Sequence, residues 1–432
     1  MNSKIVLHVA LLGLTMLAAP MARANTFNVD TTVDVPDDGL SISSCHTQVG
    51  CSLRAAIMKA NQVGGTNIVK VPAGTYTLTI RPSGSNGDST GDLNITTSIA
   101  IVGQDAEHTI INGNAIDRVF DISVGQFVGL TNVTIRNGSL QSANGAGVRN
   151  AGILTIAHCV IENNFILTGD GAGIYSTGSL DITRSIVRKN NTVGGGNGGG
   201  IAISGTAVLR ESAIDGNVAR NGGGIYVINS SQYAYVINST ISGNIAFDAG
   251  GGIHAVDLAS SDVIGLYSTS VIGNDAGDDS GGKGQGGGVY AKVDGGARFI
   301  VDNTLIANNT INGRDAFNDC VGAIEVYGNN LFSRAVPPDC AMGGDGSAAW
   351  AQISLETLGP LQDNGGPTPT HALLQNSEGI DGATNQGCVD QNHTALTTDQ
   401  RGKRRVLGVR CDIGAFEYDP ASSDRIFGND FE

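Results

Sequence analysis

The chain has 432 residues, 63 of them glycine, and its 40 acidic residues outnumber its 25 lysines and arginines to give a net charge of -15. This acidic balance argues against nucleic acid as a partner. The many glycines and few aromatic residues are typical of a thin, elongated, exported β protein. After residue 24, no run of uninterrupted apolar residues approaches the length of a membrane-spanning helix.

The first 24 residues have the three parts of a secretory signal peptide. Lys4 supplies the positive charge, the apolar stretch runs from Ile5 to Ala19, and Ala22-Arg23-Ala24 is a small-residue cleavage site. We therefore expect the mature chain to begin at Asn25. It would be secreted or attached to the cell surface, where association with the outer membrane is one route.

A short helix is predicted from Cys51 to Asn61, where Ser52 can cap the first turn. Its apolar face comprises Leu53, Ala56, Ile57 and Ala60. Such a helix can cover the open end of a stacked β structure, which would otherwise expose strand edges. A strand, a turn and a second strand follow over residues 68–78. Residues 25–125 are thus an N-terminal cap with the first coils.

One glycine-rich phrase recurs six times, and each copy ends in an aliphatic residue. These final residues are Val148, Ile174, Ile201, Ile225, Ile253 and Val289, which are separated by 26, 27, 24, 28 and 36 positions. Such a period indicates a solenoid whose coils stack on their neighbours.

Four further columns share this period. The first apolar column is Leu130, Ile156, Ile182, Leu209, Val236, Leu266 and Ile300. The second is Ile135, Ile161, Val187, Ile214, Ile241, Val271 and Leu305. Small residues form a third column: Cys159, Ser185, Ser212, Ser239, Thr269 and Asn303. Asparagines form the fourth: Asn164, Asn190, Asn217, Asn244, Asn274 and Asn308.

Apolar spacing of two within each segment indicates strands, and the offset of three between segments indicates a corner. We therefore predict a right-handed parallel β-helix with coils of about 27 residues over residues 126–335. The apolar columns would fill the interior, and the asparagines would form a hydrogen-bonded ladder. Both roles are structural.

Seven cysteines in an exported chain predict a disulfide framework with one thiol left over. Proximity in the sequence suggests three pairs: Cys45 with Cys51, Cys320 with Cys340, and Cys388 with Cys411. Cys159 is then unpaired, and its place in the column of small residues predicts a buried and unreactive thiol.

Three sets of motifs carry a resemblance to known families. The phrase at 51–57, Cys-Ser-Leu-Arg-Ala-Ala-Ile, resembles the CSLREA motif of exported bacterial β-helix proteins, with Ala55 in place of glutamate. The Gly-Gly-Gly-Ile phrases are similar to repeats of polymorphic outer-membrane proteins and of the pectate-lyase-like superfamily. Residues 358–373, 399–402 and 411–417 resemble the choice-of-anchor Q region.

The resemblance implies a secreted, surface-associated β-helix closed by a C-terminal region at residues 336–420. Members of this group mostly lack an assigned activity. By position, His371 and Arg401 would be folding determinants of the closing region, with Arg401 bonded to carboxylates or carbonyls. The tail, residues 421–432, resembles short sorting tails that end in Gly-Phe-Glu, with Asp430 in place of glycine; a frayed terminus is the alternative.

Outward positions of the central coils are the candidate catalytic site. One outward column runs Asn132, His158, Arg184, Glu211, Asn238, Ser268, Asp302, and another runs Arg136, Glu162, Arg188, Asp215, Ser242. Together they predict a charged patch of His158, Glu162, Arg184, Arg188, Glu211 and Asp215. Carboxylates beside arginine or histidine suit a glycosidase or a polysaccharide lyase. The alternating charges are also typical of a structural ion ladder between coils. The pattern favours this ladder over a catalytic site.

A second candidate is the longest interruption of the repeat, residues 274–285. Asp275, Asp278 and Asp279 could offer oxygen ligands to calcium, although no EF-hand or other calcium-binding repeat is present. A solvated loop is the alternative. Phosphate-loop, zinc-binding and nucleophile-elbow motifs are absent from the sequence.

The sequence favours a non-enzymatic adhesive or carbohydrate-binding protein whose partner is an extracellular glycan. A polysaccharide lyase or hydrolase acting at the charged patch is the alternative, and an inert spacer is the third.

Overall fold

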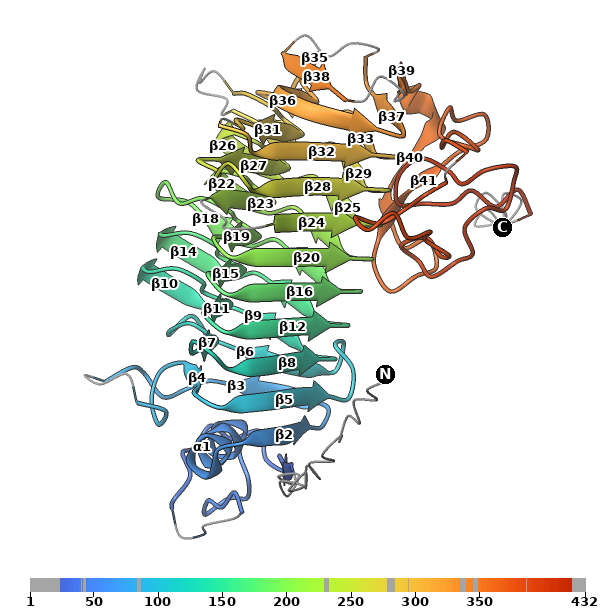
Figure 1. The fold of residues 1–432 in the computed structure, drawn as a ribbon. Coiled ribbons are helices and arrows are strands. Elements are labelled where there is room, and N and C mark those ends of the chain that lie inside the picture. Colours follow the sequence, from blue (N-terminus) through green and yellow to red (C-terminus); the bar gives the residue numbers. More distant parts are fainter. Residues whose placement is uncertain are drawn as a thin grey trace, which may run out of the picture.

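A computed structural model describes the greater part of the chain, and the expected signal peptide and sorting tail lie almost wholly outside it. The described residues are 24–39, 41, 44–83, 87–228, 233–277, 284–293, 295–334, 339–344, 349–385 and 387–421. They form a right-handed column of parallel strands that rises from the N-terminal to the C-terminal coils (Figure 1). The predicted parallel β-helix is therefore confirmed.

Three sheets run along the column. The first sheet has 20 strands, two from most coils: β1 (Asn25–Asn28), β2 (Thr66–Val71), β4 (Leu93–Ile95), β5 (Ser98–Gly103), β7 (Phe120–Ile122), β8 (Phe127–Thr131), β11 (Val148–Asn150), β12 (Ile153–Ala157), β15 (Ile174–Ser176), β16 (Ser179–Thr183), β19 (Ile201–Ile203), β20 (Thr206–Arg210), β23 (Ile225–Ile228), β24 (Tyr233–Ile237), β27 (Ile253–Val256), β28 (Val263–Tyr267), β31 (Val289–Ala291), β32 (Arg298–Asp302), β36 (Cys320–Tyr327) and β38 (Cys340–Gly343).

The second sheet has 11 strands: β3 (Gly74–Thr77), β6 (Thr109–Asn112), β9 (Thr134–Arg136), β13 (Val160–Glu162), β17 (Ile186–Arg188), β21 (Ala213–Asp215), β25 (Thr240–Ser242), β29 (Ser270–Ile272), β33 (Leu305–Ala307), β37 (Asn329–Phe332) and β39 (Ala349–Gln352). The third has eight: β10 (Ser139–Ser142), β14 (Phe165–Thr168), β18 (Asn191–Thr192), β22 (Val218–Asn221), β26 (Ile245–Ala249), β30 (Asp275–Ala276), β34 (Thr310–Ile311) and β35 (Arg314–Phe317).

One hydrophobic core fills the column from Phe27 to Phe332. Beside it, the predicted asparagine ladder is present. From Asn164 to Asn274, each side-chain Nδ2 donates to the Oδ1 of the asparagine one coil further on, at 2.9–3.0 Å. The last asparagine donates instead to Oδ1 of Asp319, at 3.1 Å. These amides are buried and fully paired, so the ladder is structural.

The predicted register is wrong by one residue in the last regular coil. In the structure, Val271 pairs with Ile306 rather than Leu305, and Leu266 pairs with Val301 rather than Ile300. The neighbouring columns shift in the same way. Thr304 therefore replaces Asn303 among the small residues, Asn309 replaces Asn308 in the ladder, and Asn303 replaces Asp302 in the outward column.

This slip has a physical cause. A shift of one residue along a strand exchanges its two faces, and here both faces are apolar. Leu305 and Ala307 point outward and pack in a second hydrophobic cluster beneath the C-terminal region. Apolar periodicity therefore could not distinguish Ile300 from Val301, or Leu305 from Ile306.

Helix α1 (Leu53–Val63) closes the N-terminal end of the column, as predicted (Figure 1). Ser52 is the N-cap, and its hydroxyl accepts a hydrogen bond from the Ala55 N–H at 3.0 Å. Its two basic side chains are buried in ion pairs, Arg54 with Asp34 and Lys59 with Asp37. The helix therefore covers the first coil with an apolar face and neutralised charges.

The glycine phrases build the corner before the first strand of each coil. The first glycine of a phrase, such as Gly222, has φ near +61°, which favours glycine. At the third glycine there is no room for a side chain: a Cβ on Gly224 would lie 2.6 Å from the carbonyl oxygen of Gly252 and 3.0 Å from Nδ2 of Asn244. These glycines let successive coils stack closely on the ladder.

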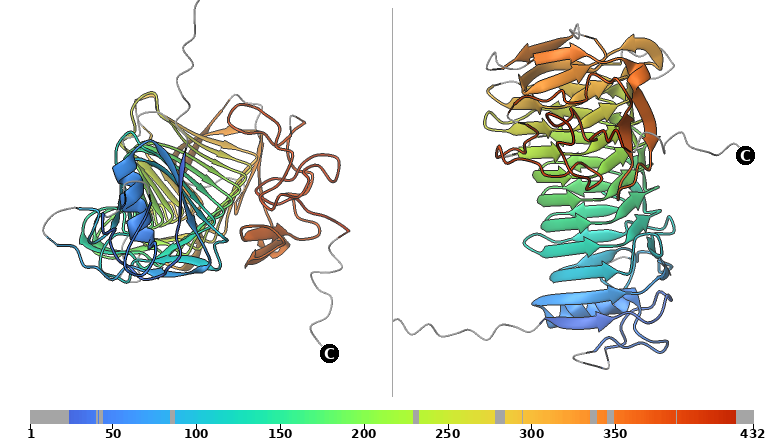
Figure 2. Two further views of the ribbon diagram at one scale, coloured as in Figure 1. Left: turned by 90° about the horizontal axis from the view of Figure 1, so that it is seen from below. Right: turned by 90° about the vertical axis from the view of Figure 1, so that its right-hand side faces the viewer.

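A C-terminal closing region follows the last coil and folds back along the outside of the column (Figures 1 and 2). It contains a short 3-10 helix (Leu355–Thr357) and an antiparallel pair, β40 (Leu358–Gln362) and β41 (Thr370–Leu373). Residues 374–385 and 387–421 run as loops against the second sheet, and Leu396 among them packs against Ile237 and Tyr267 at the edge of the first sheet. The three predicted disulfides are present, two of them at residues 320–340 and 388–411, so the region is covalently braced.

Cys159 is the unpaired cysteine, and it is buried. Its Sγ lies 3.3 Å from the Ala157 carbonyl oxygen and 3.4 Å from that of Leu130. Burial raises the pKa of the thiol to about 12, so it stays protonated and unreactive at physiological pH.

Candidate functional site

The predicted charged patch lies on the outside of β13, β17 and β21 and at the corners that precede them. Two ion pairs join adjacent coils within it. Nε of Arg184 lies 2.5 Å from Oε2 of Glu211, and a guanidinium nitrogen of Arg188 lies 2.8 Å from Oε2 of Glu162. His158 is exposed at a corner with φ near +53°. Two of the three patch carboxylates are thus engaged by arginines of neighbouring coils, as an ion ladder requires.

Asp215 differs from the other carboxylates of the patch. Its Oδ1 is buried, and no hydrogen bond to this atom is found in the described part of the chain. Burial raises the pKa of Asp215; Arg188 and Lys189 oppose the rise, whereas Glu162 adds to it. A desolvated carboxyl of this kind can serve as a general acid more readily than one held by arginine.

The outward columns continue upward beneath the closing region rather than into solvent. Ser242, the neighbour of Asp215 in the next coil, lies 2.8 Å from Nε2 of His371. Asn238 accepts a hydrogen bond at 2.6 Å from Nη2 of Arg405. These contacts tie the closing region to the column, so the charged patch ends at the edge of that region.

The motifs of the closing region form its interior. Arg401 donates to Asp399 and to the Glu417 carbonyl oxygen, both at 2.6 Å, and its guanidinium lies 3.6 Å from the Phe416 ring centroid. Arg401 thus bonds a carboxylate and a carbonyl, as the sequence suggested. The Asp412 side chain accepts two backbone hydrogen bonds, yet burial and Glu417 raise its pKa to about 7. These groups stabilise the region and face away from solvent.

The predicted calcium loop is only partly described, because Asp278 and Asp279 lie outside the described residues. The Asp275 carboxylate accepts a hydrogen bond from the Thr310 hydroxyl at 2.6 Å and from the Gly313 N–H at 3.1 Å. Its oxygens are therefore used in binding the next coil. Among the described residues, no cluster of three or more histidine, cysteine or acidic side chains is placed to hold a metal ion.

A group of tyrosines that the sequence analysis did not single out covers the outside of the first sheet near its C-terminal end. This tyrosine platform consists of Tyr233, Tyr235, Tyr267 and Tyr327. The rings of Tyr233 and Tyr235 stack at 5.1 Å, and Tyr267 meets Tyr235 edge-on at 6.0 Å. Gly265 between them is required, because a Cβ there would lie 2.4 Å from the Tyr267 ring.

Three of the platform hydroxyls, those of Tyr235, Tyr267 and Tyr327, stay protonated at physiological pH. Burial raises the pKa of Tyr235, Tyr267 and Tyr327 above the ordinary value of a phenol. Tyr267 is buried, whereas the other three rings are half-buried and remain accessible. The platform therefore offers apolar ring surface together with hydroxyl donors.

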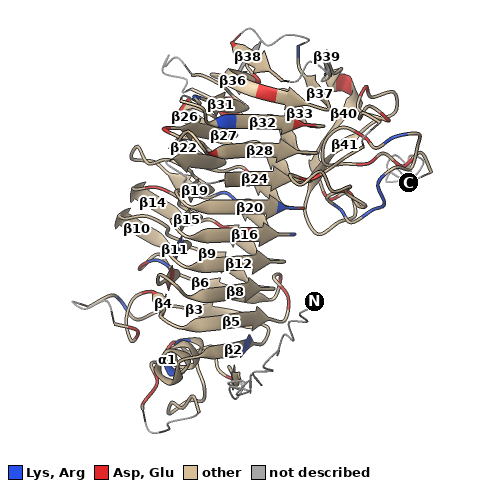
Figure 3. Cartoon of the chain, viewed as in Figure 1, with Lys and Arg blue, Asp and Glu red and all other residues tan. Residues whose placement is uncertain are grey.

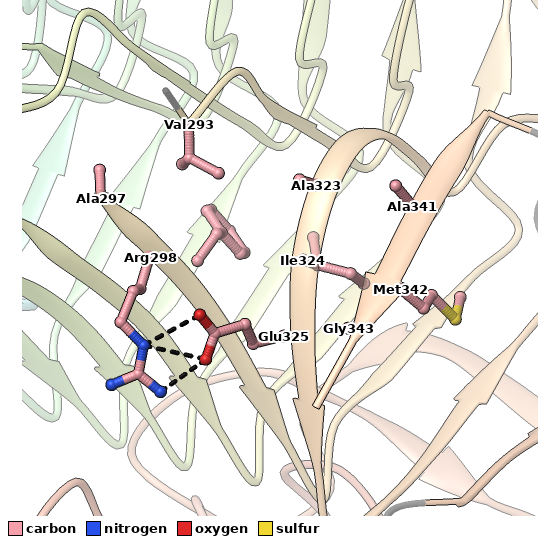
Figure 4. Close-up of a pocket in the computed structure, with 10 residues that line it drawn as sticks. Val293, Ala297, Arg298, Ala323, Ile324, Glu325, Ala341, Met342 and Gly343 are labelled. Carbon is pink, nitrogen blue, oxygen red and sulfur yellow. Dashed lines mark hydrogen bonds and ion pairs between the residues drawn. The ribbon is translucent and has the colours of Figure 1, made fainter. Parts of the chain in front are cut away.

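A polar pair and a pocket adjoin the platform. Arg298 of β32 forms a two-pronged ion pair with Glu325 of β36, with N–O distances of 2.5–3.0 Å, and also donates to the Tyr327 hydroxyl at 2.8 Å. Figure 3 shows these opposite charges on neighbouring strands of an otherwise nearly uncharged face. Behind the pair lies a pocket of about 400 Å³, lined by Val293, Phe299, Ile324 and Met342 among others (Figure 4).

A second aromatic stack lies on the same sheet, on β23, β27 and β31. The His254 ring stacks on Tyr226 at 5.3 Å and on Tyr290 at 4.7 Å. Tyr226 and His254 are buried, and burial lowers the pKa of His254 to about 4. Because two of its three rings are buried, whereas only Tyr267 of the platform is, this stack offers less accessible ring surface than the platform.

No family model and no curated protein matches the chain. Among solved structures it is similar to the crystal structure of pectate lyase Pel9A, with 15% sequence identity and a TM-score of 0.44 over 91% of this chain and 96% of that one. Within the described residues, no helix is both long and apolar enough to cross a membrane.

Proposed function

We propose that this protein is an extracellular carbohydrate-binding protein, and that a glycan binds across the tyrosine platform with one unit directed toward the adjoining pocket. The observation that carries this proposal is the platform itself: four tyrosines gathered on one face of a rigid sheet. Three disulfides support the extracellular setting, because such bonds persist in oxidising compartments.

The chemistry of the platform suits a sugar. Aromatic rings can pack against the apolar C–H face of a pyranose, while phenol hydroxyls and charged groups bond its hydroxyls. Arg298 and Glu325 hold each other and the Tyr327 hydroxyl in fixed positions at the rim. A preorganised polar rim reduces the entropic cost of binding.

A glycan array probed with the mature chain tests the proposal, followed by affinity measurements on the best ligand. Replacing Tyr235 with alanine should weaken binding about tenfold or more, as removal of a central aromatic contact does. Tyr235→Phe keeps the ring and should retain most of the affinity. Tyr175→Ala, on another part of the sheet, is the matched control. Unchanged binding by Tyr235→Ala would refute this location.

Asp215 favours a second candidate function, a polysaccharide lyase or hydrolase acting at the charged patch. Its buried and unbonded oxygen, with a raised pKa, is the one feature of the patch that the ion ladder does not explain. The test is incubation with a panel of acidic polysaccharides, followed by assays for reducing ends and unsaturated uronates. Activity that survives joint replacement of Arg188, Glu211 and Asp215 would place the site elsewhere.

A further inference from the structure

A loop of the closing region, residues 403–410, combines exposed aliphatic side chains with exposed cations. Three aliphatic residues project from it: Val406 is 43% exposed, Leu407 is 42% exposed and Val409 is 85% exposed. Lys403, Arg404 and Arg410 surround them and are also exposed. We call these residues the basic-apolar loop.

The three exposed cations of this loop are not used to stabilise the fold. Within the part of the chain that the structure describes, the side chains of Lys403, Arg404 and Arg410 form no ion pair. The nearby carboxylates bind backbone amides instead. Asp399 accepts a hydrogen bond from the backbone N–H of Lys403, and Asp381 accepts one from the backbone N–H of Arg410. Positive charge is therefore displayed to solvent on a chain whose net charge is -15.

The loop is held rigidly in this exposed arrangement. The buried carboxylate of Glu417 accepts hydrogen bonds from the N–H groups of Val406 at 2.9 Å and Leu407 at 3.1 Å. Val406 has φ near +65°, which is rare and unfavourable for a β-branched residue. Such strain persists only where the surroundings enforce it.

Arg405 anchors the loop to the column. It is buried, and its Nη2 donates to Oδ1 of Asn238 at 2.6 Å and to the Gly414 carbonyl oxygen at 2.8 Å. The loop projects from the side of the column that carries the closing region, where Figure 3 shows blue segments among the loops. The aliphatic side chains thus point away from a fixed base.

We propose that the basic-apolar loop binds the surface of a lipid bilayer with anionic headgroups. Exposed aliphatic side chains can enter the boundary between headgroups and acyl chains, while flanking cations bind the headgroups. A purely ionic partner, such as an acidic polysaccharide, would make no use of three projecting aliphatic residues. This inference is independent of glycan binding by the tyrosine platform.

Co-sedimentation of the full mature chain with phosphatidylcholine vesicles, with and without phosphatidylglycerol, tests the proposal. Binding should require phosphatidylglycerol and weaken as salt is added. Joint replacement of Lys403, Arg404 and Arg410 by glutamine should weaken it about fivefold per charge, or about a hundredfold together. Lys70→Gln, an exposed lysine at the N-terminal end, is the control and should change nothing.

The aliphatic residues are tested separately. Val409→Asp should reduce vesicle binding at least tenfold, whereas Val124→Asp should not, although Val124 is 78% exposed. The Val409→Trp variant should show a blue shift of its emission when anionic vesicles are added, and the Val124→Trp variant should not. Both positions are highly exposed, so folding is preserved.

Several outcomes would overturn the proposal. Failure to bind anionic vesicles does so directly, and so does equal binding to neutral vesicles. If Val409→Asp binds as well as the original chain, the contact is electrostatic only and insertion is wrong. Tyr235→Ala should bind vesicles normally, so failure of the glycan proposal is distinguished from failure of this one.

Discussion

The outer face of the second sheet has two halves with the same interior but different exteriors. In the lower half, Glu162 and Arg188 occupy one outward column and form an ion pair. In the upper half, the same column continues as Ser242 and Ile272, which are buried beneath the closing region. The repeat therefore determines which side chains point outward. The closing region determines whether those outward side chains are charged and exposed or uncharged and buried.

Removal of the anchor of the closing region should have the largest effect. Arg405→Met leaves the buried carboxylate of Glu417 without its ion-pair partner and removes the positive charge that faces Asp412. Breaking a buried pair in this way typically costs about 3–5 kcal/mol. Thermal unfolding and limited proteolysis should show the upper half exposed while the lower coils stay intact. Arg410→Met is the matched control; equal loss of stability in that variant would contradict this account.

The two halves can be compared directly at one column. Ile272→Ala removes a buried contact with the closing region and should lower the free energy of unfolding by about 2–4 kcal/mol. Arg188→Ala, two coils below Ser242 in the same column, should cost less than about 1 kcal/mol. Chemical denaturation of both variants measures the difference. Similar losses of unfolding free energy in the two variants would show that burial beneath the closing region does not determine how much an outward side chain contributes to stability.

The contribution of His371 to the stability of the upper half should be lost in acid. Burial lowers the pKa of His371, whose Nδ1 donates to the Gly359 carbonyl oxygen and whose Nε2 accepts from Ser242. The unfolded region would bind a proton near pH 6.5, so stability is present above that pH and falls below it. The hydrogen-exchange protection factors of residues 355–385 and 387–421, which allow for the slower intrinsic exchange in acid, should fall at lower pH. His371→Gln should reduce this pH dependence, and an unchanged profile would exclude His371 as the cause.

The smallest effect is expected from the ion ladder of the lower half. A double-mutant cycle on Glu162 and Arg188, with Gln and Met as replacements, should give a coupling of about 0.2–1 kcal/mol, because the pair is partly solvated. Added salt should reduce it further. A coupling of several kcal/mol would mean that this ion pair, rather than the closing region, determines the stability of the outer face.

Much of the fold followed from the sequence because inward positions obey a strict period. The asparagine ladder was predicted because its residues recur once in every coil. The capping helix and the disulfides were predicted because the residues that form them lie near one another in the sequence. The prediction failed at Leu305, where the closing region makes the outer face apolar as well. Only a contact between residues far apart in the chain could have revealed that.

The tyrosine platform was missed for a related reason. Ala234 and Val236 point inward, so alternation alone places Tyr233 and Tyr235 outside. Tyr267 and Tyr327, however, lie in later coils, and loops of unequal length separate these coils in the sequence. They come near Tyr233 and Tyr235 only when the coils stack. The sequence shows outward tyrosines, and the three-dimensional stacking is what gathers them on one face. The role of the charged patch remains a prediction.

The acidic residue that ends the asparagine ladder limits how this protein can change its length. Each asparagine both donates and accepts, so a duplicated coil inserted anywhere along the ladder would be accommodated and would add about 4.8 Å of height. Asp319 only accepts, and it also receives hydrogen bonds from Ser333. A coil added beyond it would find no donor, so we expect homologous columns to have grown or shrunk from within, with their two ends kept unchanged.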